Sequence, residues 1–116
     1  MAYCIEYQDG TRATMLMLNG ANEDFVFSAR VAGQGLVATQ FFRSPPPNVT
    51  HSACLAAKIE EMFSTGAAPY PAHRTMLVSG ILEACLTSRE RLNQRIETPH
   101  MDVCYQPPAD SQYARA

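Results

Sequence analysis

Alternation of apolar and polar residues opens the chain and predicts an antiparallel meander. Tyr3, Ile5 and Tyr7 alternate with polar or small neighbours, which is the period of a half-buried strand. Asp9-Gly10 then predicts a tight turn, because both residues tolerate a positive φ angle. The same cues, with further turns at 19–20 and 33–35, predict strands over residues 1–8, 11–18, 25–28 and 36–43.

The pattern then changes to helical spacing. Asn48 is a suitable N-cap for a helix that ends near residues 63–64, with Gly66 in position for a left-handed C-terminal cap. A second, longer helix is predicted from about residue 71 to residue 89. Its Gly80, Ala84 and Ser88 recur at every fourth position, so a sheet or another helix can approach that face closely.

A last alternating segment, residues 95–105, predicts a closing strand that is interrupted by Pro99. The expected fold is therefore α+β: an antiparallel sheet of four or five strands with two helices packed on one face. The domain spans residues 1–106, and residues 107–116 form a flexible tail. Because the strands are apolar on both faces, two helices leave one face bare, and we expect a homodimer through that outer sheet face.

Composition excludes several classes of protein. The chain has 116 residues, 47% of them hydrophobic, and a formal net charge of −2, which fits one soluble domain. The chain has no basic patch with interleaved aromatic residues, which argues against nucleic acid as the main partner. No apolar run is long enough to span a membrane. Four cysteines without a C-x-x-C pair are expected to be reduced core residues, with zinc or disulfide pairing as the alternative. Together with the lack of a signal peptide, this favours the cytoplasm.

The second helix and the closing strand carry a family resemblance. Pro71, Arg74-Thr75, Gly80-Ile81-Leu82-Glu83 and the segment 95–100, Arg-Ile-Glu-Thr-Pro-His, resemble the carboxy-terminal end of the glucose–fructose oxidoreductase, inositol dehydrogenase and MocA family. The stretch from Tyr7 to Gly20 resembles a hairpin of the same domain, and the similarity extends from about residue 3 to residue 105.

The chemistry that this resemblance implies belongs to other parts of such proteins. Family members resemble one another in a glycine-rich dinucleotide-binding domain with an active-site lysine, followed by a catalytic aspartate-and-histidine helix. Here Gly33-Gln34-Gly35 has no third glycine, and Lys58, the single lysine, lies in a predicted helix. We therefore expect no catalytic residue, cofactor site or metal site in this chain. NAD or NADP is expected in a longer parent protein, next to an N-terminal dinucleotide-binding domain.

A few polar residues remain as candidates for binding. The resemblance places His100 on the closing strand, where it could face a substrate cleft, although a structural role is favoured. Tyr70 and His73 are further candidates for such a cleft. Arg74 is expected to form a structural ion pair with Glu83 or Glu97.

The resemblance implies the substrate-side and oligomerisation domain of a nicotinamide-dependent oxidoreductase that acts on a sugar, polyol or related carbonyl compound. This chain alone is expected to be inactive. The alternatives are a stand-alone module that binds a small ligand or a protein, and a purely structural dimerisation unit. A glycine-rich strand–helix unit upstream in the gene would favour the enzyme.

Overall fold

The computed structural model describes residues 1–41, 46–47 and 49–109, and within them the predicted α+β class is confirmed. The predicted cap at Asn48, the end of the fourth strand at Arg43 and most of the predicted tail lie outside the described residues. The elements are β1 (Ala2–Glu6), β2 (Arg12–Leu16), β3 (Val26–Val31), β4 (Gly35–Gln40), α1 (Val49–Thr65), α2 (Ala72–Glu90) and the short 3-10 helix η1 (Pro99–Met101).

The strands form two separate antiparallel hairpins, β1–β2 and β3–β4. The first turn forms at the predicted position: Gly10 has φ +84°, and the Thr11 amide donates to Asp9 Oδ1 at 2.8 Å. It is longer than the expected two-residue turn, because the Tyr7 amide donates to the Thr11 carbonyl at 2.9 Å across residues 8–10. A single sheet of four or five strands is not present among the described residues. Turn residues and alternation determine each hairpin locally, whereas pairing between hairpins depends on contacts that a local pattern does not contain.

The predicted closing strand does not form within the described residues. The alternation predicted for its second part is nevertheless present, because Met101, Val103 and Tyr105 are half-buried while Asp102 and Cys104 are exposed, and exposure also alternates over residues 95–98. The 3-10 helix η1 then begins at Pro99. A strand is stabilised by ladder hydrogen bonds to a neighbour, and here the described chain supplies none.

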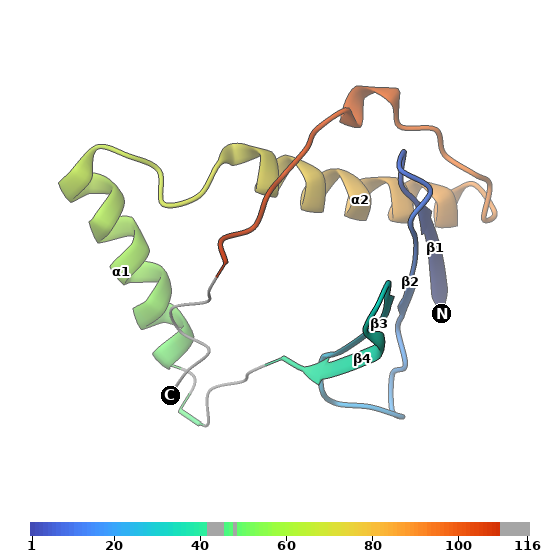
Figure 1. Cartoon of the computed structure of the whole chain (residues 1–116), viewed down its shortest axis with the longest axis horizontal. Coiled ribbons are helices and arrows are strands. Elements are labelled where there is room, and N and C mark those ends of the chain that lie inside the picture. Colours follow the sequence, from blue (N-terminus) through green and yellow to red (C-terminus); the bar gives the residue numbers. More distant parts are fainter. Residues whose placement is uncertain (42–45, 48, 110–116) are drawn as a thin grey trace.

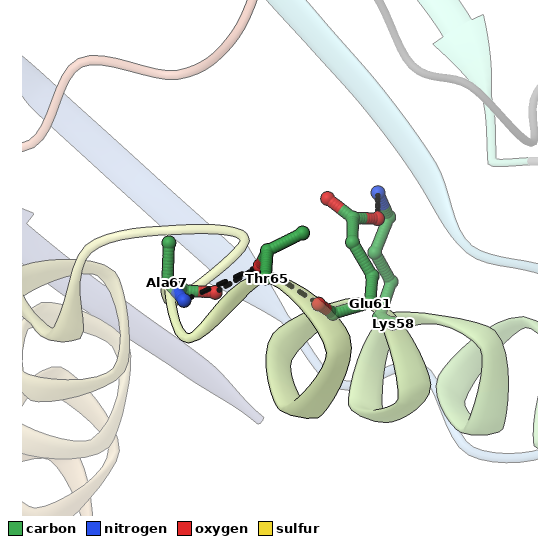
Figure 2. Close-up of polar contacts among 4 residues, drawn as sticks. All are labelled: Lys58, Glu61, Thr65 and Ala67. Atoms are coloured by element: carbon green, nitrogen blue, oxygen red, sulfur yellow. Dashed lines mark hydrogen bonds and ion pairs between the residues drawn. The ribbon is translucent and has the colours of Figure 1, made fainter.

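Helix α1 ends as its sequence predicts. The Gly66 amide donates to the Met62 carbonyl at 2.9 Å, and Gly66 has φ +69°. Figure 2 shows Thr65 Oγ1 donating to the Glu61 carbonyl at 2.8 Å, while the Ala67 amide donates to Thr65 Oγ1 at 3.3 Å. Lys58 and Glu61 form an ion pair one turn earlier, at 2.6 Å. The last turn of α1 is therefore held by side chains and by a left-handed glycine.

The small-residue face of α2 is closely approached, as predicted, but by a different element. A Cβ atom built on Gly80 would overlap Sδ of Met101, so the side chain of η1 occupies the space above this glycine. Beyond Glu90 the chain turns sharply through Leu92 and Asn93, which have φ +59° and +64°. That turn directs the following segment back along α2.

The molecule is open. Helix α2 lies beside β1, whereas α1 stands away from both hairpins, so the two helices do not share one sheet face (Figure 1). Cys85 is the only buried hydrophobic residue of the described chain, and α1 contains no buried residue. The radius of gyration is 16.9 Å, against about 13 Å for a compact chain of this length.

Apolar side chains are correspondingly exposed on both hairpins. They include Leu16, Met17, Leu18, Phe25, Val26 and Phe27. The accessible surface is 10107 Å², whereas a folded monomer of 12.8 kDa exposes about 6,300 Å². No helix in the described ranges has the length and apolarity that a membrane crossing requires.

Candidate functional site

The described chain has a cleft of about 490 Å³ between β1, the small-residue face of α2 and the returning segment 93–98. All five residues of β1 line it. Successive side chains of a strand point to opposite faces. A strand whose residues all line one cleft therefore presents its edge to that cleft.

Helix α2 forms the floor of the cleft through Gly80, Ile81, Ala84, Cys85 and Ser88. The three small residues among them recur at every fourth position, so this side of the helix has little side-chain bulk and leaves room above the backbone. Cys85 is 8% exposed, and its burial raises the pKa of the thiol. The thiol is therefore a neutral part of the floor rather than a ready nucleophile.

The returning wall is held to the end of α2 by two hydrogen bonds. Ser88 Oγ donates to the Gln94 carbonyl at 2.7 Å, and the Asn93 amide donates to the Ser88 carbonyl at 2.8 Å. Ser88 thus serves as both donor and acceptor for the reversing turn. Segment 94–98 consequently lies across the cleft from β1.

A charged cluster bridges the two walls. Arg95 Nη1 lies 2.6 Å from Glu6 Oε2, and Arg95 Nε lies 2.6 Å from Glu97 Oε1. The hydrogen bond and charge of Glu97, followed by those of Glu6, raise the pKa of Arg95. The same three residues also line a second, more open hollow of about 660 Å³ toward Gly10 and Pro99. The cluster therefore stands between the two hollows.

The candidate binding residues predicted from the sequence lie outside both hollows. His73 is exposed in the first turn of α2, and His100 is exposed in η1. Tyr70 is 40% exposed and lies beneath the guanidinium of Arg74, whose Cζ is 4.9 Å from the ring centre.

Arg74 therefore has a different partner from the two that were predicted. Within the described ranges it forms no ion pair with Glu83 or Glu97, because it stacks on Tyr70 and Glu97 pairs with Arg95. The i, i+2 spacing of Arg95 and Glu97 on a predicted strand was the sequence signal for the observed pair. Glu6 had no such signal, since it lies 89 positions from Arg95 in the chain.

The thiols are also distributed differently from the prediction. Cys85 is the buried core residue that was expected, Cys54 is half-buried, and Cys4 and Cys104 are exposed. No cluster of three or more potential metal ligands occurs in the part of the chain that the structure describes.

The cleft is better suited to binding than to proton transfer. No histidine lines it to activate the hydroxyl groups of Tyr3, Ser88 and Thr98, and the Ser88 hydroxyl is engaged with a backbone carbonyl. Its walls combine a charged cluster with apolar groups and extended backbone. Comparisons with models of protein families, with characterised proteins and with solved structures find no match to this chain.

Proposed function

We propose that this chain is the substrate-side and oligomerisation domain of a nicotinamide-dependent oxidoreductase that acts on a sugar, a polyol or a related carbonyl compound. The residues at 71–83 and 95–100 that resemble this enzyme family motivate the chemistry. In this proposal the hydride transfer takes place in the parent protein, where a separate domain binds NAD or NADP. The exposed His100, Tyr70 and His73 are the proposed substrate-side residues.

The observation that carries the proposal is the unfinished core. An α+β unit that buries a single hydrophobic residue among those that the structure describes, and exposes 10107 Å², needs further surfaces to cover it. A domain of a larger, paired enzyme has such surfaces on its neighbours. We propose that the two hairpins join a larger antiparallel sheet there, with the helices on one face and a second subunit on the other.

The decisive experiment compares the complete product of the gene with the 116-residue chain. Both are incubated with NAD or NADP and a panel of sugars and polyols, and reduced nicotinamide is followed by its absorbance. We expect turnover by a complete product that carries a glycine-rich domain, and none by the chain alone. A complete product without such a domain and without turnover would contradict the proposal.

The cleft itself favours one alternative, a stand-alone module for a small polar ligand. Its volume of about 490 Å³ lies in the range of ligand pockets, and its lining contains Glu6, Arg95, Asn93 and apolar groups. Titration of the isotopically labelled chain with inositol, glucose and glucosamine would test this function. Saturable shifts of the Ser88 and Arg95 signals would support it, and no shift at millimolar concentration would exclude it for these ligands.

A further inference from the structure

The outer edge of β1 has unpaired backbone groups. Met1 and Tyr7 form hydrogen bonds to Met17 and Thr11, which flank β2. Because hydrogen-bonded and non-hydrogen-bonded pairs alternate along an antiparallel ladder, Ala2, Cys4 and Glu6 direct their N–H and C=O groups away from β2. The cleft lies along β1, so this free edge forms its first wall.

The opposite wall is a segment without a strand partner. Residues 94–98 form no helix or strand and belong to neither sheet, and exposure alternates from Arg95 to Thr98. Within the described chain, the N–H and C=O groups of Arg95, Ile96 and Glu97 have no backbone partner. Two free edges therefore face each other across one cleft, an arrangement that accepts an added strand.

We propose that each copy of this chain inserts its segment 94–98 into the cleft of a second copy. The strands of the resulting sheet lie in this order: β2 and β1 of the first copy, segment 94–98 of the second copy, segment 94–98 of the first copy, and β1 and β2 of the second copy. Each extended segment gains a neighbour on both sides, and the twofold axis passes between the two segments. Both copies use the same surfaces in this contact, so it forms a closed dimer, as twofold symmetry requires. It concerns the proposed role in subunit pairing but assigns the contact to the edge of β1 and to segment 94–98 instead of the outer sheet face, and it is independent of the proposed chemistry.

Charge complementarity identifies a second copy as the occupant. Antiparallel pairing centred on Ile96 places Arg95 opposite Glu97 of the second copy and Glu97 opposite Arg95 of the second copy. Ile96 then meets Ile96 of the second copy. Opposite charges and apolar pairs at directly facing positions both stabilise antiparallel strands. The segment is thus complementary to itself in this one direction.

The cleft can receive the strand at low cost. The Met101 side chain occupies the space above Gly80, but Ala84 and Ser88 line the cleft with little side-chain bulk, so an incoming strand has room over that part of α2. The Glu6–Arg95 ion pair that spans the cleft is on the surface, with side-chain exposures of 50% and 70%, and such pairs open readily. Insertion also joins two marginal hairpins into one continuous sheet.

Charge reversal tests the inference directly. In the Arg95→Glu variant, the introduced carboxylate would face Glu97 of the second copy at both symmetric positions, and Glu97→Arg would place two guanidinium groups opposite each other in the same way. Each single variant is expected to raise the dimer Kd about tenfold or more. The double variant Arg95→Glu/Glu97→Arg restores facing opposite charges, and its Kd is expected within about threefold of the original.

Analytical ultracentrifugation measures each Kd, and circular dichroism verifies that each variant is folded. Arg30→Glu, on exposed β3, is the matched control and should leave the Kd unchanged. Ile96→Cys gives a second readout, because oxidation should yield a peptide that links position 96 of both copies. Ser79→Cys, exposed on α2, is the control for random linkage. A dimer that both single reversals leave intact, or one without the 96–96 link, would overturn the inference and assign pairing to another surface.

Discussion

At the scale of single residues, burial separates the four cysteines into different chemical environments. Cys85 is buried and its pKa is raised by desolvation, whereas Cys104 is exposed in the extended segment after η1. The thiolate is the reactive form, and a raised pKa leaves Cys85 protonated at about pH 8. We therefore expect iodoacetamide to label the exposed Cys4 and Cys104 first and Cys85 last, as followed by mass spectrometry of digests. As a control, all four thiols should be labelled at one rate in urea. Early labelling of Cys85 under native conditions would show that its thiol is not buried.

Gly80 is the residue at which a single side chain should matter most. A leucine there would displace the Met101 side chain from its position against α2, so Gly80→Leu should destabilise the chain by roughly 1–3 kcal/mol. Urea melts measure the change. Ser79→Leu places the same side chain at an exposed position of the same helix and should be nearly neutral. Adding Met101→Ala to Gly80→Leu should recover part of the loss, and an unchanged midpoint for Gly80→Leu would show that this face is open.

At the scale of elements, the end of α2 holds an unusual residue for its conformation. Leu92 has φ +59° and is 88% exposed, so it carries the steric cost of a left-handed backbone without burying its side chain. Leu92→Gly removes this steric cost, although glycine also raises the conformational entropy of the unfolded state. The net effect should be a stabilisation of the chain by up to about 1 kcal/mol. Leu86→Gly, inside α2, should destabilise by about 1 kcal/mol instead. Thermal melts of the two variants that shift in the same direction would contradict this argument.

Elements with local signals could be predicted from the sequence, and their assembly could not. Asp9-Gly10 and Gly66 carry their own turn chemistry, so the first hairpin and the end of α1 lie where they were expected. The closing strand was predicted from alternation alone, but a ladder needs a neighbour, and residues 95–98 have none within the described chain. The candidate site was missed for the same reason, because Glu6 and Arg95 meet only through the fold.

At the scale of the whole molecule, cofactor binding provides one test. A dinucleotide site needs a glycine-rich turn between a strand and a helix, with an acidic residue for the ribose. Gly33 instead lies in the turn of the β3–β4 hairpin, and Gly35 follows that turn as the first residue of β4. We expect calorimetric titration of the 116-residue chain with NAD and NADP to give no saturable heat. Saturable binding at micromolar concentration to either one would contradict the assignment of this chain to the substrate side.

Self-association is the second test at this scale, and it follows from surface area. The chain exposes 10107 Å², several thousand Å² above the value expected for a compact monomer of its mass. Stable interfaces bury about 1,200–2,000 Å² in total, so a second copy can account for part of this excess. We therefore expect light scattering coupled to gel filtration to report a dimer at micromolar concentration.

Because apolar contacts weaken little with salt while facing charges are screened, a dimer held through segment 94–98 should loosen at about 1 M sodium chloride. A monomer near 12.8 kDa would contradict the expected dimer and the two apolar sheet faces from which it was predicted.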